Sequence, residues 1–408
     1  MNKRKIINDP VFGFINIPDE FIFGIINHPY VQRLNRIRQL GLAFYVYPGA
    51  VHSRFHHSLG AMHLMSEAIN QLRSNGHPIS DEEKSGAMAC ILMHDIGHGP
   101  FSHALENTLV NRISHEEISL LLMNRMNREM DGKLDLAIAI FKDTYPKKFL
   151  HQLVSGQLDV DRLDYLRRDS FFTGVTEGNI GSARILKMLN LKDDKLVIEA
   201  KGIYSIENFL MARRLMYWQV YLHKTAVAAE NMLINTLRRA KYLASQGVEL
   251  NVTPALHYFL YNQVDKTTFE NYPEALDFFV ELDDNDIWCA LKAWEKNTDK
   301  VLSLLCYGLV NRNLFKIEMS QTPVSPEIVM EKTECYTKTY GLSLEEASYL
   351  LSADAITTDM YREEDDSIAI LYKDGTTHDI STASDMLNIQ LLSKKIKKYY
   401  LCFLRDSK

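Results

Sequence analysis

The sequence contains little cysteine. Its 408 residues include only five cysteines, which are far apart and form no CxxC pair: Cys90, Cys289, Cys306, Cys335 and Cys402. An odd number of scattered cysteines argues against a disulfide framework, and the missing CxxC pair argues against a zinc ribbon. Reduced thiols are typical of the cytoplasm, so we expect a cytoplasmic protein.

Long apolar runs and an excess of positive charge are also missing. No stretch of about 18 uncharged apolar residues occurs, so we expect no membrane span. The basic first residues lead into short apolar stretches broken by Asp9, Pro10 and Gly13, which is not the pattern of a signal peptide. The formal net charge of -6 gives no electrostatic reason to expect nucleic-acid binding.

The remaining composition, 46% hydrophobic and 24% charged, is that of a globular protein in which helical periodicity dominates. We expect extended segments over residues 1–26 and helices from about Pro29 onward. Residues 80–83 resemble a capping box. A long helix is predicted over about 204–245, short helices over 250–352, and a β-hairpin with an Asp-Gly turn over 368–380. One buried helix face is predicted from apolar spacings of three and four: Leu59, Met62, Met65, Ile69 and Leu72.

Histidines are concentrated in one part of the chain. Nine of the 14 lie between His52 and His115, where an even spread would place about two. Among them, His94 stands beside Asp95 at the end of the apolar run 87–93. A buried carboxylate must be paired or bind a metal. The pattern therefore indicates a metal centre or an acid/base centre.

Four side chains are candidate ligands of one divalent ion: His57, His94, Asp95 and Asp161. Two imidazoles and two carboxylates suit Mn, Fe, Mg, Zn or Ni and leave positions open for water and substrate oxygens. Such an ion lowers the pKa of a bound water and withdraws charge from a phosphoryl oxygen. Any one of these histidines, taken alone, is more often a packed or surface residue than a ligand.

Further polar groups recur at helical spacing around these four. Candidate acid/base groups are His98, His103 with Glu106, and His115 with Glu116. Asp161, Tyr165 and Asp169 are predicted to share one face of a helix. A second predicted stripe comprises Arg213, Tyr217, Tyr221 and Lys224. Spacing alone favours a solvated or packing face for that stripe, but two cations and two tyrosines also suit a polyphosphate and a sugar.

These residues resemble a known family. The series His57, His94-Asp95, Asp161 is similar to the signature of the HD-domain phosphohydrolases. Six segments resemble the branch of that family that hydrolyses deoxynucleoside triphosphates (dNTPs): residues 5–13, 39–41, 45–50, 54–60, 94–103 and 159–165. The similarity continues through 221–224 and fades to 311–316. It implies a mainly α HD-domain helical fold with small β elements near the N-terminus and a C-terminal β-hairpin.

The resemblance also implies roles for individual residues. Metal ligands are His57, His94, Asp95 and Asp161. His98, His103 and His115 are expected to surround the α-phosphate, with His103 as proton donor and Glu106 or Glu116 as its orienting partner. Residues expected to grip the triphosphate are Arg54, Arg162, Tyr165 and Arg213. Gln39 and Asp169 are expected to read the sugar 3′-hydroxyl, while Leu40 and Tyr221 crowd a ribose 2′-hydroxyl.

The chain departs from the vertebrate members of this branch. The matching segments start almost at Met1, so we expect no SAM domain before them. Lys5 and Asn8 match the regulatory nucleotide pocket of those members, whereas Asn27 replaces an acidic residue that reads guanine. An amide cannot accept two hydrogen bonds from the guanine edge as a carboxylate does. Asn27 therefore argues against activation by GTP, and nucleotide-dependent assembly with another nucleotide as activator is left as one alternative.

The sequence predicts a metal-dependent enzyme that hydrolyses dNTPs, with dGTP as a candidate preferred substrate, to a deoxynucleoside and inorganic triphosphate. Other nucleotides, monophosphate or cyclic, are the alternative substrates, and a nucleotide sensor with low turnover is the non-enzymatic alternative. We expect residues 1–245 to form the catalytic domain and residues 246–408 to form a helical region with packing and subunit contacts. The partners expected are a nucleotide and further copies of the chain, not a membrane or nucleic acid.

Overall fold

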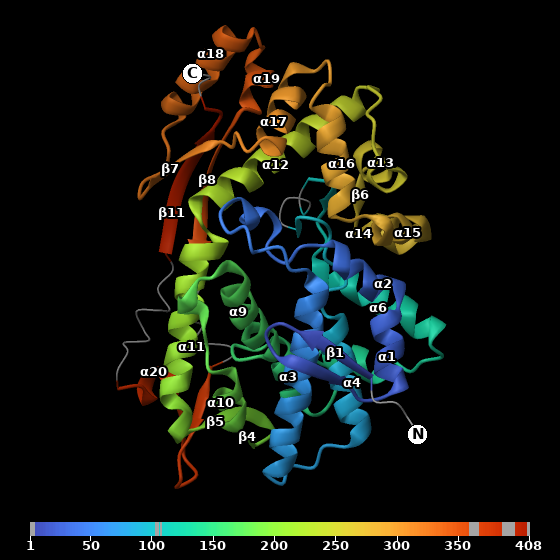
Figure 1. Cartoon of the computed structure of the whole chain (residues 1–408), viewed down its shortest axis with the longest axis vertical. Helices are drawn as coiled ribbons and strands as arrows, with labels where there is room; N and C mark the ends of the chain where they lie inside the picture. Colours follow the sequence, from blue (N-terminus) through green and yellow to red (C-terminus); the bar gives the residue numbers. More distant parts are fainter. Residues whose placement is uncertain (1–4, 103–105, 107, 359–366, 386–395, 406–408) are drawn as a thin grey trace.

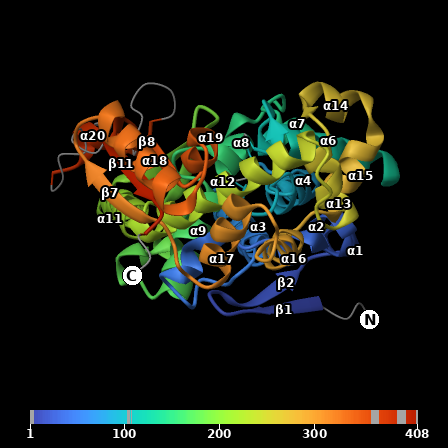
Figure 2. The same ribbon diagram turned by 90° about the horizontal axis from the view of Figure 1, so that it is seen from above.

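The computed structural model of the protein describes residues 5–102, 106, 108–358, 367–385 and 396–405. The fold is mainly α with small sheets, as predicted (Figure 1). A view from above, in Figure 2, puts the hairpin of strands β1 (Lys5–Asp9) and β2 (Gly13–Ile17) and the strand β11 (Ile396–Phe403) on different sides of the molecule. Within the described part of the chain, no helix combines the length and the apolar character needed to cross a membrane.

The N-terminal segment is only partly extended. Strands β1 and β2 form an antiparallel hairpin, as expected. The expectation of extended structure up to residue 26 is wrong, because helix α1 (Glu20–Asn27) already begins at Glu20. Asp19 caps this helix by accepting a hydrogen bond from the Ile22 amide at 2.8 Å. Ile22, Ile25 and Ile26 then bury one helical face, which stabilises the helix.

Two central helices confirm the local predictions. Helix α3 (Arg54–Ser74) buries all five residues of the predicted apolar face. Helix α4 (Asp81–Met93) begins with the predicted capping box, in which Ser80 and Glu83 exchange side-chain to backbone hydrogen bonds. Around them lie α2 (Pro29–Arg33), α6 (His115–Glu129), α7 (Asp135–Phe141), α8 (Lys148–Ser155), α9 (Val160–Thr173), α10 (Ser182–Lys187), the short strand β3 (Val110–Asn111), and single 3₁₀ turns at Leu34–Arg36, Gly41–Tyr45, Thr176–Gly178 and Ala200–Gly202.

The long helix predicted over 204–245 is interrupted. Helix α11 (Ile203–Met216) passes into a π-helical turn, Tyr217–Tyr221, and a new helix, α12 (Lys224–Ser245), follows. His223 caps α12, its ring nitrogen accepting a hydrogen bond from the Thr225 amide. A π turn holds more residues than an α turn. The predicted stripe from Arg213 to Lys224 therefore does not lie on one regular helix, although the rings of Tyr217 and Tyr221 still pack edge-on with centroids 5.2 Å apart.

The short helices expected over 250–352 are present: α13 (Pro254–Tyr261), α14 (Lys266–Asn271), α15 (Pro273–Glu281), α16 (Asp284–Trp294), α17 (Lys300–Val310), α18 (Pro326–Tyr340) and α19 (Leu344–Ser348). The strands of this region were not predicted. They are β6 (Val264–Asp265), β7 (Lys316–Ser320), β8 (Leu351–Thr358) and the late strand β11. Strand β11 pairs antiparallel with β7 on one side and with β8 on the other.

The predicted hairpin near the C-terminus is confirmed. Strands β9 (Ala369–Leu371) and β10 (Thr377–Asp379) pair antiparallel, and helix α20 (Ile380–Ala383) follows. Gly375 adopts a φ of 84° in the turn, a conformation that glycine adopts without steric cost. Unexpectedly, β9 also pairs in parallel with β5 (Lys195–Glu199), which pairs with β4 (Leu189–Lys192). A late segment thus completes a sheet begun near residue 189.

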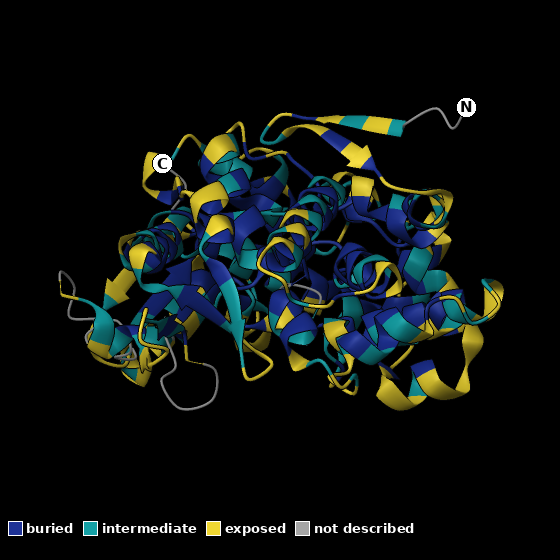
Figure 3. Ribbon diagram, turned by 90° about the horizontal axis from the view of Figure 1, so that it is seen from below, coloured by how far each residue is buried: buried dark blue, intermediate teal, exposed yellow. Residues whose placement is uncertain are grey.

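One continuous core fills the molecule. Its buried hydrophobic residues run from Ile15 in β2 to Leu404 next to β11. Figure 3 shows buried residues, in dark blue, across the interior of the whole molecule and exposed residues mainly at its outside. Residues from both sides of position 245 therefore contribute to the same core. The division into regions 1–245 and 246–408 stays a proposal.

Candidate active site

Three helix termini bring the candidate metal ligands together. His57 lies in the first turn of α3, which starts where the Ser53 amide donates a hydrogen bond to the His56 ring. His94 and Asp95 directly follow the end of α4. Asp161 lies in the first turn of α9, whose N-cap is Asp159. Each ligand position is therefore determined by where a helix begins or ends.

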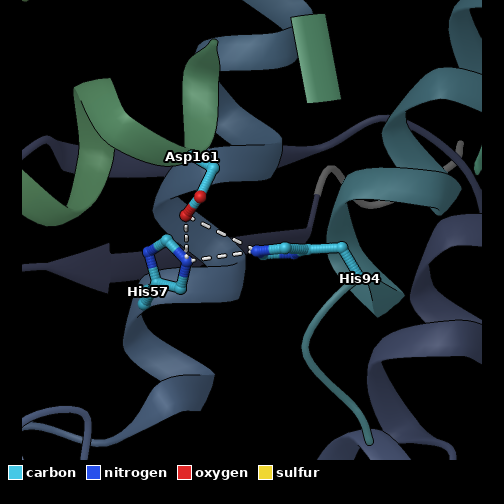
Figure 4. Close-up of side chains that lie close together, drawn as sticks. All are labelled: His57, His94 and Asp161. Atoms are coloured by element: carbon cyan, nitrogen blue, oxygen red, sulfur yellow. Dashed lines mark hydrogen bonds and ion pairs between the residues drawn. The ribbon is translucent and has the colours of Figure 1, made fainter. Parts of the chain in front are cut away.

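The side chains of His57, His94 and Asp161 converge on one point (Figure 4). The Nε2 atoms of the two histidines are 3.4 Å apart. The Oδ1 atom of Asp161 lies 3.0 Å from His57 Nε2 and 3.5 Å from His94 Nε2. Ligand atoms about 2.1 Å from a shared ion are themselves about 3.0–3.4 Å apart at ordinary coordination angles. The three atoms therefore have the spacing of a common metal shell.

The other ring nitrogens of both histidines are anchored. His57 Nδ1 lies 2.7 Å from Asp164 Oδ2, and His94 Nδ1 lies 2.6 Å from the carbonyl oxygen of Ile91. Metal-binding histidines usually donate their second N–H to a carboxylate or carbonyl in this way, which fixes the tautomer and turns Nε2 toward the ion. The donor set and its support both fit a divalent cation.

Asp95 lies beside this cluster and is shared among several groups. Its Oδ1 atom is 3.2 Å from His94 Nε2 and 3.3 Å from His98 Nε2. Its Oδ2 atom accepts a hydrogen bond from Arg54 at 2.7 Å and is 3.9 Å from His57 Nε2. The predicted fourth ligand is thus within reach of the cluster and links it to Arg54 and His98.

The electrostatics of the cluster are those of a cation site. Burial alone would lower the pKa of His57, but hydrogen bonds and charges from Asp161 and Asp164 raise it to about 10. Burial would raise the pKa of Asp161, but the two histidines hold it well below its ordinary value. The carboxylates of Asp161 and Asp164 therefore stay ionised and favour positive charge at this point.

The candidate acid/base groups form a second cluster around His115. Its Nδ1 atom lies 3.2 Å from Glu106 and its Nε2 atom 3.3 Å from Glu116. Its ring stacks on His98 with centroids 3.8 Å apart. Burial and the charge of Arg54 hold the pKa of His98 well below its ordinary value. Both predicted orienting glutamates thus contact His115, while His103, the predicted proton donor, lies outside the described residues.

The residues expected to grip a triphosphate surround the metal cluster with unused donors. Arg54 binds Asp95, Arg162 binds Asp159 and the Gly156 carbonyl, and Arg213 donates to Gln157 at 3.1 Å. The Nε atoms of all three arginines are buried and have no hydrogen-bond partner among the described residues. Tyr165 lies beside the metal cluster, with its ring centroid 6.5 Å from that of His57. Buried N–H groups without partners are costly unless a ligand accepts their hydrogen bonds.

The residues expected to contact the sugar are joined by a histidine that sequence reasoning missed. Asp169 Oδ2 accepts a hydrogen bond from the Tyr221 hydroxyl at 2.8 Å, and Asp169 Oδ1 lies 2.8 Å from His52 Nε2. The His52 carbonyl accepts a hydrogen bond from the Gln39 amide at 3.0 Å. Leu40 follows directly and is partly buried. His52 therefore connects the segment of Gln39 and Leu40 with Asp169 and Tyr221.

Further supporting residues were also missed. Asp159 caps α9 and binds Arg162, Asp164 holds His57, and Arg168 binds Asp164 through two nitrogens. The i,i+4 spacing of Asp164 and Arg168 was a visible signal for one of these pairs. Arg33 had no such signal. It is fully buried and donates to the carbonyls of Leu282, Ile96 and His98, so its role depends on a contact 249 residues away.

Comparisons with known proteins agree with this geometry. Residues 54–169 match the HD domain, and residues 180–250 match the HD associated region. The uncharacterized protein YwfO of Bacillus subtilis is 33% identical over 420 residues, covering 100% of this chain and 93% of YwfO. A crystal structure of a phosphohydrolase from Bacteroides thetaiotaomicron is 65% identical, covers 99% of this chain and 100% of that one, and superposes with a TM-score of 0.96.

A relative with a named substrate class is more distant. The deoxynucleoside triphosphate triphosphohydrolase SAMHD1 homolog of Dictyostelium discoideum is 30% identical over 255 residues, covering 58% of this chain and 49% of that protein. The chain thus spans about half the length of that enzyme. The full-length similarity to YwfO and to the Bacteroides phosphohydrolase, with the HD-domain match over residues 54–169, shows that the chain belongs to the HD-domain family of metal-dependent phosphohydrolases.

Proposed function

We propose that the chain hydrolyses deoxynucleoside triphosphates, with dGTP as the first candidate, to the deoxynucleoside and inorganic triphosphate. The observation that carries the proposal is the set of three buried arginine Nε–H groups without partners around the metal cluster, from Arg54, Arg162 and Arg213. A monophosphate would leave most of these donors unused, whereas three linked phosphates have enough oxygens to accept from all of them.

The proposed metal ligands are His57, His94, Asp95 and Asp161. A divalent ion held there supplies a lower pKa for a bound water and withdraws charge from a phosphoryl oxygen. The contacts of Asp95 with both Arg54 and His98 support this assignment, since one carboxylate then orients a phosphate-binding cation and a group beside the α-phosphate. Mn, Fe, Mg, Zn and Ni are the candidate ions for this donor set.

Proton transfer to the leaving 5′-oxygen is assigned to His103, in line with the sequence prediction. The rings of His98 and His115 stack on each other, and the carboxylates of Glu106 and Glu116 both contact His115. A carboxylate that accepts from an imidazole orients the ring and stabilises its protonated form. We therefore assign these two glutamates to the orientation of His115.

The sugar-binding roles rest on the paired Asp169 and Tyr221. Their hydrogen bond leaves the carboxylate beside the tyrosine ring, and the ring of Tyr221 packs edge-on against Tyr165 at 6.0 Å. We assign the sugar 3′-hydroxyl to Asp169 and Gln39, whose Oε1 atom is buried without a partner among the described residues. Leu40 and Tyr221 are assigned to the exclusion of a ribose 2′-hydroxyl.

Phosphorus NMR of the purified protein with Mn²⁺ and each dNTP, with GTP as the ribonucleotide control, tests the proposal. Inorganic triphosphate formed from dNTPs and not from GTP is the expected result. Orthophosphate or pyrophosphate as product would contradict the proposed position of attack and favour another nucleotide substrate. No product from any nucleotide, with tight binding in a titration, would favour the sensor.

Assembly and regulation belong to the same proposal. We propose that the protein self-associates and that a nucleotide activates it. Lys5 and Asn8 lie on β1, where we place the activator pocket. We further propose that residues 246–408 supply packing and subunit contacts, and that the protein is cytoplasmic. Size-exclusion chromatography with light scattering, with and without added nucleotide, tests the assembly.

A further inference from the structure

A buried chain of charged side chains connects the N-terminal hairpin to the metal cluster. Asp9, at the end of β1, binds Arg168 NH1 through Oδ2 at 2.7 Å. Arg168 grips Asp164 through Nε and NH2, both at 2.9 Å. Asp164 Oδ2 lies 2.7 Å from His57 Nδ1, and His57 Nε2 faces the metal position. No link in this series exceeds 2.9 Å, so the four side chains form one continuous relay.

The relay is shielded from water. The side chains of Arg168, Asp164 and His57 are 0% exposed, and that of Asp9 is 2% exposed. Buried ionic groups interact far more strongly than exposed ones, because little solvent screens them. Gly60 in α3 makes the arrangement possible. A Cβ atom there would lie 1.9 Å from Asp164 Oδ1 and 2.2 Å from Arg168 NH2.

Two arginines of α9, Arg167 and Arg168, hold the hairpin on this helix, and they differ in what else they contact. Asp9 Oδ1 accepts hydrogen bonds from the Val11 and Phe12 amides at 2.9 Å, which forms the turn. Arg167 donates to the Val11 carbonyl at 3.1 Å and lies over the Phe12 ring, but it forms no hydrogen bond or ion pair with Asp164 among the described residues. In Figure 3 the hairpin lies at the edge of the molecule, with exposed residues on its outer side. Arg167 therefore shares the seating of the hairpin with Arg168, but only Arg168 continues to His57.

The charges predict the direction of the effect. When a metal ion is bound, the His57 ring is neutral, and Asp9, Arg168 and Asp164 together carry a net charge of about −1 behind it. Without the Asp9 charge, Arg168 would interact with Asp164 alone and would withdraw more electron density from it. Asp164 would then be a weaker acceptor for the hydrogen bond that orients His57. Loss of the Asp9 charge would also remove the negative charge that favours a cation. Both effects lower metal affinity.

We infer that Asp9 and Arg168 are positioning residues of the metal centre, so that the seating of the N-terminal hairpin sets the affinity for the divalent ion. Coupling between two sites is reciprocal. Metal binding therefore also strengthens the docking of the hairpin. The inference rests on the metal centre of the proposed function and is independent of the substrate.

Calorimetric titration of the metal-free protein, without nucleotide, tests the coupling. The probe is whichever of Mn²⁺, Zn²⁺ and Ni²⁺ binds the wild-type protein most tightly. Asp9→Asn keeps the acceptor that forms the turn and removes the charge that faces Arg168, so we expect about tenfold weaker binding. Arg167→Ala is the matched control. It loosens the same hairpin without touching the relay, and we expect its affinity to stay within about twofold of wild type.

Hydrogen exchange gives a second measurement, which tests the coupling in the wild-type protein as well as in the two variants. Metal binding should slow amide exchange in residues 5–17 of wild type and of Arg167→Ala, but not of Asp9→Asn. Equal loss of affinity in both variants, or unchanged affinity in Asp9→Asn, would overturn the inference. Unchanged exchange in the wild-type hairpin on metal binding would overturn it too. No binding of any ion to wild type would remove the metal centre itself, whereas a failed turnover assay alone would leave the coupling intact.

Discussion

Three aspartates within six residues behave differently because their neighbours differ. Burial raises the pKa of Asp159 to about 7 in spite of its partner Arg162. The pKa of Asp161 is held low by His57 and His94 against the effect of burial, and that of Asp164 by Arg168 and His57. One caps a helix, one faces the ion and one orients a histidine. Residue type alone does not separate these roles, whereas the partners do.

Asp161→Ala tests the metal assignment at the level of a single residue. The variant removes one ligand atom, so we expect kcat to fall roughly a thousandfold or more, which corresponds to about 4 kcal/mol of transition-state stabilisation. The fold should persist, measured by circular dichroism, because the side chain of Asp161 is 27% exposed. Asp81→Ala, also in the first turn of a helix but 97% exposed, is the control and should leave turnover unchanged.

Tyr221 tests the sugar filter. Tyr221→Ala removes the bulk proposed to crowd a 2′-hydroxyl, so the ratio of kcat/KM for GTP to that for dGTP should rise by about tenfold or more. Tyr221→Phe keeps the ring and loses only the hydrogen bond to Asp169. It should lower activity toward dGTP without admitting GTP. A similar ratio in both variants would contradict a steric filter at this position.

At the level of elements, α3 and α9 approach closely because residue 60 is glycine. In Gly60→Ala the added Cβ would overlap the buried pair of Asp164 and Arg168, so we expect a loss of about 3–5 kcal/mol in the free energy of unfolding. Gly24→Ala in α1 is the control. A Cβ there meets nothing within 4 Å, and the helix should gain about 0.5–1 kcal/mol. Urea denaturation measures both.

The docking of α16 against the segment 36–38 makes stability depend on pH. Asp284 accepts a hydrogen bond from the Arg38 amide at 3.0 Å, and burial raises its pKa to about 6 from 3.8. Between these pH values the folded state binds more protons than the unfolded state, so this group adds stability as the pH falls from 6 toward 3.8. Its ionised form costs stability above pH 6.

Asp284→Asn removes that cost and keeps the acceptor. The variant should be more stable than wild type at pH 7.5, by at most about 3 kcal/mol, and the difference should shrink toward zero near pH 4. Urea denaturation of both proteins at the two pH values checks this. A difference that is independent of pH would show that the Asp284 carboxyl does not titrate with a raised pKa.

At the level of the whole molecule, the two halves of the chain are not independent. Strand β9 pairs with β5, and the buried Arg33 joins the Leu282 carbonyl to those of Ile96 and His98 beside the metal ligands. A fragment of residues 1–245 would expose apolar core and leave Arg33 with fewer partners. We expect it to aggregate or to lack a cooperative thermal transition in circular dichroism, in contrast to the full chain. A cooperative, monomeric fragment would contradict this expectation.

Features that depend on local spacing were predictable. The buried face of α3, the capping box of α4 and the hairpin of β9 and β10 each follow from residues a few positions apart, and the structure confirms them. The single long helix over 204–245 was predicted wrongly, because a π turn at Tyr217–Tyr221 and a new helix from Lys224 interrupt it. Strands β8 and β11 were missed, since each is stabilised by a partner far away in the sequence.

The candidate site shows the same contrast between features set by local sequence and features set by contacts between distant residues. The sequence by itself determined the ligand types and the helix termini that carry them, since the cap residues and the His-Asp pair are local signals. Only the tertiary structure decided that His52 bridges Gln39 and Asp169, that Arg33 holds the loop of the metal ligands, and that Asp9 reaches His57 through Arg168. These contacts join residues between 13 and 249 positions apart, and packing rather than periodicity brings such residues together.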